Sequence, residues 1–270
     1  MSNESKFQEL NNANKIWAIG SIHSSLESFK SIKKYILSNF YFGDKLVFLG
    51  NIIGFGSKSK EIISEVLDLR FHLMAKFHLT NEDIVFLRGA QEEMFSKLLQ
   101  LQTAPNPIEI LEWIFSHGVD QTVISYNFDP NEFREIASQG TIQINKLTTK
   151  LNNQISLIAG HKEFFSNLKH AAYSDTKELL FVNRGVDISR PLSAQYDCFW
   201  WGYQNFALID KPYNSFKRIV RGYQSNEYND LENSKNKILC TLFRQPLKNN
   251  TILSGIFSKN GEILELFESN

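Results

Sequence analysis

The chain has 270 residues, of which 42% are hydrophobic and 21% charged, a composition typical of a globular protein that buries a large core. Lys plus Arg and Asp plus Glu both number 29, so net charge gives no reason to expect a nucleic-acid or anionic-membrane partner. No apolar run approaches the roughly 20 residues needed to span a bilayer. Cys198 and Cys240 make neither a metal-type spacing nor a disulfide framework, which predicts a cytoplasmic protein.

Residues 1–14 are polar and lack the basic and apolar zones of a signal peptide. We expect them to form a lead-in that can be disordered, followed by a single domain over residues 15–270. Three segments then share one pattern, in which an apolar strand leads through a Gly-containing turn into an amphipathic helix. The strands are predicted at residues 16–19, 46–49 and 84–87. Three successive units of this kind favour a mostly parallel sheet covered by helices.

The pattern changes in the middle of the chain. Residues 105–126 and 131–158 are predicted to be helices with no strand between them, which suggests a helical cap over about residues 105–160. Strand signals return at "ELLFVNRG", "FALID", "KRIVRG" and "KILCTLF", and a closing hairpin turns at Asn260–Gly261. A polar stretch at 225–237 is predicted to be a surface loop. The residues alone therefore predict an α/β fold with a largely parallel N-terminal half and a more antiparallel C-terminal half.

The turns that follow these strands carry a specific resemblance. They read "GSIHS", "GNIIGFG", "GAQEE", "FVNRG" and "RGYQ", in this order. The sequence resembles the calcineurin-like metallophosphoesterases, in particular the Ser/Thr phosphoprotein phosphatases and the symmetrical dinucleoside tetraphosphatases. The turns of that family read Gly-Asp-x-His-Gly, Gly-Asp-x-x-Asp-Arg-Gly and Gly-Asn-His-Glu, followed by a strand ending in His and a later Gly-His. The resemblance runs from Ile16 to Phe267 and implies a four-layer α/β/β/α sandwich with a helical insertion.

The resemblance also implies where the family's two divalent metals would be bound. Those metals are bridged by a carboxylate and a hydroxide, and they clamp the phosphate while lowering the pKa of the attacking water. Ser21 stands at the position of the first metal Asp, and His23 matches the first metal His. Asn51 replaces the bridging Asp. Gly54 and Phe55 stand where the second Asp and a phosphate-binding Arg are expected.

The later turns depart from the family pattern in the same way. Ala90 replaces the metal Asn, and Gln91 replaces the His that protonates the leaving group. Asn183 and Tyr223 replace metal histidines, and Gly202 falls where a second phosphate-binding Arg is expected. Ser and Asn are weak neutral ligands, and Ala offers no ligand atom. Of the family's metal ligands only His23 is kept, and we interpret it as a partly buried structural histidine.

We therefore predict a pseudophosphatase that needs no cofactor; Mn or Fe/Zn is the alternative if a rebuilt site exists. Arg88, Arg184 and Arg221 lie beside the altered turns, and together with His23 they could bind a phosphorylated or anionic group without metal. The alternative is that these arginines pair with nearby carboxylates or point into solvent. Glu92 is interpreted as a favourable charge in the first turn of a helix.

Three functions remain open at this point. The first is an inactive phosphatase-like protein that binds a protein partner or a phosphorylated small ligand. The second is a residual metal-dependent phosphoric ester hydrolase, acting on phosphoproteins or dinucleoside polyphosphates through a rebuilt site. The third is a scaffold subunit of a larger assembly, which predicts a pocket filled by Phe55 and Tyr223. We favour the first and expect no enzymatic activity, no nucleic-acid partner and no membrane span.

Overall fold

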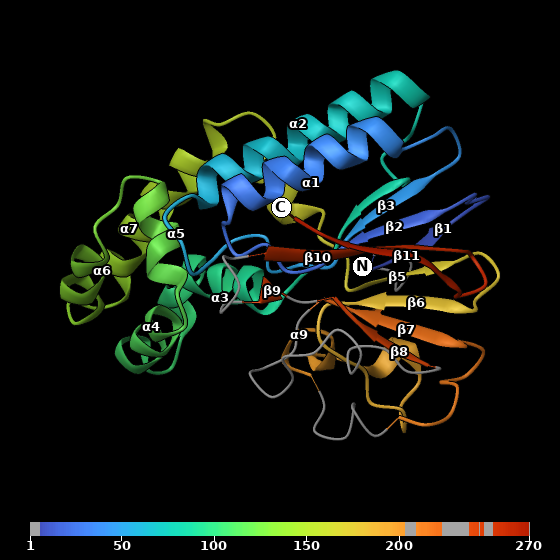
Figure 1. Ribbon diagram of the computed structural model, residues 1–270. Coiled ribbons are helices and arrows are strands. Elements are labelled where there is room, and N and C mark those ends of the chain that lie inside the picture. Colours follow the sequence, from blue (N-terminus) through green and yellow to red (C-terminus); the bar gives the residue numbers. More distant parts are fainter. Residues whose placement is uncertain (1–5, 203–208, 223–237, 243, 246–250, 270) are drawn as a thin grey trace.

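The computed structural model describes residues 6–202, 209–222, 238–242, 244, 245 and 251–269. Two β-sheets stack face to face, and helices cover the outer face of the first sheet (Figure 1). In the first sheet three parallel strands continue into an antiparallel pair, and a short strand, β9, pairs with β10. Its strands, in spatial order, are β11 (Ile263–Glu268), β10 (Thr251–Phe257), β2 (Ile16–Ile19), β3 (Lys45–Phe48) and β4 (Ile84–Phe86), with β9 at Arg244–Gln245.

The second sheet is built from one strand near the N-terminus and four strands between Ala171 and Thr241. Its strands, in spatial order, are β1 (Phe7–Leu10), β5 (Ala171–Ser174), β6 (Leu179–Val182), β7 (Arg218–Arg221) and β8 (Leu239–Thr241). The pairing of β1 with β5 is parallel, and so are those of β6 with β7 and β7 with β8; only β5 and β6 run antiparallel. The C-terminal half has the more antiparallel character expected where β5 pairs with β6 and where β10 pairs with β9 and β11, whereas β6, β7 and β8 run parallel.

The strands β2, β3 and β4 of the first sheet are buried on both faces, which explains their continuous apolar runs. In β2, Trp17 and Ile19 face the helices, while Ile16 and Ala18 face the second sheet. On the helical side, α1 (Leu26–Asn39) buries Phe29, Ile32 and Ile36 at helical spacing. The first sheet thus separates two apolar layers of the core.

The helices fall into a layer and an insertion. On the first sheet lie α1 and α2 (Ser59–Phe77), while α3 (Ala90–Leu99) begins beyond the end of β4 and contacts helices of the insertion. The insertion contributes α4 (Pro107–Ser116), α5 (Val119–Ser125), α6 (Pro130–Ala137) and α7 (Thr141–Ser156), and α8 (His161–Ser166) leads back to β5. None of the helices in the described residues combines the length and the apolar character needed to cross a bilayer.

The fourth layer is thin. In the described part of the chain, the outer face of the second sheet is covered by α9 (Cys198–Trp201), the 3₁₀ turn Leu192–Ala194 and irregular segments (Figure 1). The four-layer α/β/β/α sandwich with a helical insertion is therefore confirmed, with unequal outer layers. The predicted strand at 206–210 falls mostly outside the described residues, and the predicted loop at 225–237 falls wholly outside them.

The polar lead-in is ordered where the structure describes it. Residues 7–10 form β1, which pairs in parallel with β5 and places Leu10 in the core between the sheets. The expectation of disorder is wrong for these four residues, because alternating side chains there can pack on opposite faces of a sheet edge. The boundaries of the cap remain a prediction.

Candidate functional site

The altered turns meet at one edge of the sandwich, where strands from both sheets end. The amide N–H and the hydroxyl of Ser21, after β2, both donate to the carbonyl of Gly222, at 3.1 and 2.7 Å. The amide of Gly222, after β7, donates to the carbonyl of Asn183 at 2.8 Å. Asn183 itself follows β6, so turns from three strands are bonded directly to one another. We call this cluster of turns the strand-end site.

The turns after β3 and β4 are in direct backbone contact. Gly50 has a φ of +82°, and a Cβ at this position would lie 2.7 Å from the amide nitrogen of Gly89. Only glycine accommodates both the left-handed backbone and the close approach. The side-chain oxygen of Asn51 accepts a hydrogen bond from the amide of Gln91 at 3.1 Å. The two turns therefore form one unit at the start of α3.

A buried carboxylate holds this unit together. Oε1 of Glu92 accepts hydrogen bonds from the amides of Ile52 and Ile53, at 2.7 and 3.2 Å. Oε2 accepts from the amides of Asn51 and Gly89, both at 2.9 Å. Burial raises the pKa of the Glu92 carboxyl, and the backbone donors oppose that rise. Glu92 does lie in the first turn of α3, as predicted, but sequence reasoning missed its contact with the turn after β3.

Backbone strain is concentrated in these turns. Four non-glycine residues here have positive φ, namely His23 (48°), Ser24 (58°), Asn51 (53°) and Phe55 (56°). Such conformations are unfavourable for residues with a Cβ, above all for a bulky one such as Phe55. They persist only where surrounding contacts over-determine them, and they cluster at functional sites. Contacts around these turns therefore maintain their strained backbone conformations.

The donor atoms at the metal-ligand positions do not fit a pair of divalent cations. The Ser21 hydroxyl donates to a backbone carbonyl, and the amide nitrogen of Asn183 donates to the carbonyl of Leu49 at 2.6 Å. The side-chain oxygen of Asn51 is committed to an amide N–H. No carboxylate occupies a bridging position, and within the described ranges no group of three or more His, Cys, Asp or Glu side chains could hold a metal ion.

The retained histidine lies under an aromatic ring. His23 is 6% exposed, and its ring contacts the edge of Phe55 with centroids 5.1 Å apart. Phe55, at 53% exposure, also touches Gly118 of the insertion, and its amide donates to the Gly118 carbonyl at 3.1 Å. Gln91 donates to the carbonyl of His117 at 2.9 Å, while its own side-chain oxygen is buried against Gly54. The insertion thus seals this side of the site.

The three arginines have different surroundings. Arg88 donates to Glu93 at 2.8 Å and lies over the ring of Trp200, so it forms an ion pair beside the site. Arg221 is 8% exposed and donates to the hydroxyl of Thr241 and the carbonyl of Arg184, at 2.9 and 3.4 Å. Burial, together with the neighbouring charge of Arg184, lowers the pKa of Arg221 to about 10. Arg184 and Arg221 are therefore brought together, and Arg88 is not shown to join them.

An aromatic wall continues from the insertion toward the arginines. Trp113 stacks on His117 at 4.7 Å and meets Trp201 of α9 edge-on at 5.6 Å. Next to Trp201, a Cβ at Gly202 would lie 3.0 Å from the side chain of Arg184. The sequence offered no periodic signal for this wall. Of the other predicted positions, Ala90 begins α3 and Tyr223 lies outside the described residues.

Comparison with known proteins gives a match by structure only. No protein-family model matches the sequence, and no curated protein matches it. A candidate diadenosine tetraphosphatase aligns over 98% of this chain and 98% of its own, with a TM-score of 0.51 and 13% identity. A protein serine/threonine phosphatase from Saccharomyces cerevisiae, with similarity to human phosphatase PP5, aligns over 98% of this chain and 84% of its own, with a TM-score of 0.53 and 15% identity.

A cold-active protein-tyrosine phosphatase from a psychrophilic Shewanella species also aligns over 100% of this chain and 85% of its own, with a TM-score of 0.50 and 11% identity. At such low identity these similarities establish the fold alone. They agree with the order of turns and with the two stacked sheets. The chain has the fold of the calcineurin-like metallophosphoesterases.

Proposed function

We propose that this chain is a catalytically inactive phosphatase-like protein that binds a phosphorylated ligand at the strand-end site. The observation that carries the proposal is the state of the donor atoms where the fold family binds metal. Ser21 and Asn183 donate to backbone carbonyls, and Asn51 accepts from a backbone amide. Metal-assisted phosphoryl chemistry needs ionised oxygen ligands that hold two cations a few ångströms apart. These side chains instead serve to fasten the turns.

The ligand class follows from the charges that replace the metals. Arg184 and the buried Arg221 lie side by side at the ends of adjacent parallel strands. Guanidinium groups bind phosphate through charge-assisted, often bidentate hydrogen bonds. The buried cysteines Cys198 and Cys240, whose spacing makes no disulfide framework, support a cytoplasmic setting.

The first test is a phosphatase assay. Purified protein supplied with Mn²⁺ should not hydrolyse p-nitrophenyl phosphate or diadenosine tetraphosphate above a metal-only blank. Hydrolysis that is lost in the variant His23→Ala would support the alternative, a residual phosphoesterase with a rebuilt site. Hydrolysis that survives this change would indicate a contaminating enzyme.

The second test is calorimetric titration of the full chain with inorganic phosphate. Phosphate should bind, and Arg184→Met should weaken it about tenfold, because one charge-assisted contact is lost. Arg134→Met is the matched control, since Arg134 pairs with Glu112 on the insertion. No phosphate binding, or equal effects of the two changes, would remove the ligand assignment and favour a scaffold.

A further inference from the structure

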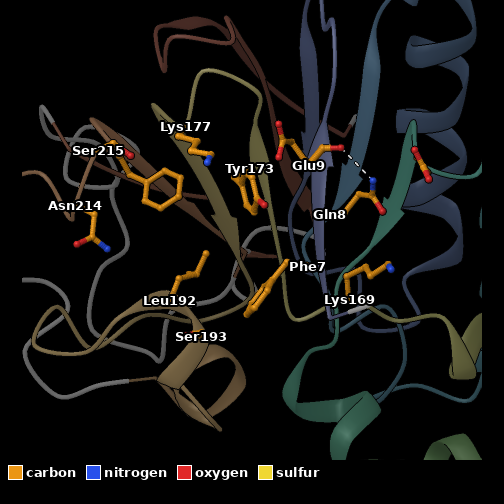
Figure 2. Close-up of a pocket in the computed structure, with 12 residues that line it drawn as sticks. Phe7, Gln8, Glu9, Lys169, Tyr173, Lys177, Leu192, Ser193, Asn214 and Ser215 are labelled. Atoms are coloured by element: carbon orange, nitrogen blue, oxygen red, sulfur yellow. Dashed lines mark hydrogen bonds between the residues drawn. The ribbon is translucent and has the colours of Figure 1, made fainter. Parts of the chain in front are cut away.

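A groove on the outer face of the second sheet carries an inference independent of the proposed function. The groove has a volume of about 680 Å³ and crosses β5 and β1 on the side covered by the thin fourth layer (Figure 2). Sites for small molecules typically measure roughly 300–1,000 Å³. The residues of the strand-end site do not line it. We call it the outer groove and define it by Phe7, Tyr173, Lys177, Leu192 and Phe216.

The floor of the outer groove is aromatic and aliphatic. Phe7 on β1 and Tyr173 on β5 project side by side into it, with Leu192 on the opposite wall (Figure 2). The rings of Tyr173 and Phe216 lie 6.1 Å apart. In the described part of the chain Phe7, Tyr173 and Leu192 are only partly buried, whereas Phe216 is 5% exposed. An apolar ligand body would complete the packing of the partly buried side chains.

The wall opposite β1 is braced by a buried glutamine. Nε2 of Gln195 donates to the carbonyls of Asp187 and Arg190, at 2.7 and 3.0 Å, and to the hydroxyl of Tyr213 at 3.1 Å. Its Oε1 accepts from the amide of Asp187 at 2.6 Å. The ring of Tyr213 stacks on Phe216. The segments that carry Leu192 and Phe216 are thereby fixed before any ligand binds, which lowers the entropy cost of binding.

The charges around the outer groove are unevenly paired. Burial, together with the neighbouring charge of Glu9, raises the pKa of Tyr173. Glu82 and Lys169 also line the groove. Lys177 lines the groove after β5 and, within the described ranges, makes no ion pair with a carboxylate. Its ammonium therefore presents positive charge beside an apolar floor.

We propose that the outer groove binds a small ligand with an aromatic or bulky aliphatic body and one carboxylate, which pairs with Lys177. The body lies against Phe7, Tyr173 and Phe216, and the carboxylate projects toward the turn after β5. This assigns a second ligand site to the chain, on a different face from the strand-end site.

Three probes of matched shape test the charge requirement. The full chain would be titrated by calorimetry with 2-naphthoate, 2-naphthamide and 2-naphthylmethylamine. Naphthoate should bind about fivefold more tightly than the amide, the difference expected from one exposed ion pair. The amine should bind most weakly. No saturable binding up to the solubility limit, or equal binding of all three probes, would overturn the proposal.

Variants then locate the site. Lys177→Met should lower the affinity for naphthoate to that for the amide and leave the amide unchanged. Lys150→Met, an exposed change on α7, is the matched control and should alter nothing. Leu192→Ser should lower the affinity for all three probes. Arg184→Met should have no effect, which separates this groove from the strand-end site. Loss of naphthoate binding in Arg184→Met, or its persistence in Lys177→Met, would contradict the assignment.

Discussion

The two sides of the strand-end site hold their turns by opposite means. On the side of the first sheet, the turns after β3 and β4 close around a buried anion, Glu92, which binds only backbone amides. On the side of the second sheet, β6 and β7 end beside a pair of cations, Arg184 and Arg221. The carboxylate of Glu92 accepts hydrogen bonds from four backbone amides, whereas the arginines lie next to the aromatic side chains of Trp113 and Trp201. Turn geometry can therefore persist without metal ligands. The side of the first sheet holds a buried negative charge, and the side of the second sheet holds two positive charges.

Removal of the buried anion should have the largest effect. Glu92→Ala leaves buried amides without an acceptor, and we expect the free energy of unfolding to fall by about 4 kcal/mol. Urea unfolding followed by circular dichroism measures this loss. Glu132→Ala is the matched control, because Glu132 is also an acidic residue in a first helical turn. It should cost only about 0.5 kcal/mol. Equal decreases in the free energy of unfolding would mean that Glu92 acts only through its favourable charge at the helix start.

Acidification should destabilise the folded chain through two buried histidines. His161 contacts Tyr126 and Ser64, and burial lowers its pKa to about 4. Below about pH 6.5 the imidazole of His161 is protonated in the unfolded chain but stays neutral in the folded chain. The free energy of unfolding therefore decreases as the pH falls toward 4. Between pH 7 and 5 the loss should be about 2 kcal/mol for this group. His170, with the same shift, adds a similar loss.

Chemical denaturation at the two pH values measures that slope. His161→Gln should remove about half of it, and His78→Asn, at an exposed left-handed helix end, should leave it unchanged. An unaltered slope in His161→Gln would show that the acid-sensitive group lies elsewhere, which includes the strand-end site itself.

The aromatic wall should add base recognition to the cationic side. AMP and ribose 5-phosphate share a phosphate and differ in the base. We expect the base to stack on Trp113. Trp113→Ser should then lower the affinity for AMP about tenfold, the scale of one stacked base, and leave the affinity for ribose 5-phosphate unchanged. Calorimetry of both ligands measures this. A parallel loss for both would mean that Trp113 supports the fold of the site, not the ligand.

The smallest effect concerns the strained ring over His23. Phe55→Gly relieves a positive φ at an exposed bulky residue, so stability should rise by about 1 kcal/mol. Phe42→Gly, at an exposed site outside the left-handed region, should lower stability or leave it unchanged. Urea midpoints of the two variants decide the matter. A loss in Phe55→Gly would mean that the contact with His23 outweighs the strain.

Much of the fold could be predicted because local patterns determine it. The apolar runs before Gly20, Gly50 and Gly89 are buried strands, and the stripe with Phe29 and Ile32 is a helix face. The parallel run of β6, β7 and β8 could not be predicted, since it depends on the long connections between these strands. The strand in the lead-in was missed because residues 7–10 gain their apolar contacts only from β5 and the opposite sheet.

For the site, residue types could be predicted and contacts could not. The turns gave the identities at Ser21, Asn51 and Asn183, but not that their polar atoms bind backbone groups. Glu92 carries no sequence signal that separates a helix-start charge from a clamp on a distant turn. The same holds for Arg88, whose ion pair with Glu93 needs three-dimensional placement.

The most direct measurement is the metal content of the full chain. The protein would be dialysed against Mn²⁺, washed and analysed by elemental mass spectrometry, with the variant His23→Ala treated in parallel. The account predicts no stoichiometric metal in either protein, because the donor atoms at the family's ligand positions are neutral and fastened to the backbone. Two metals per chain, lost in His23→Ala, would contradict it and identify the chain as a metal-dependent phosphoesterase.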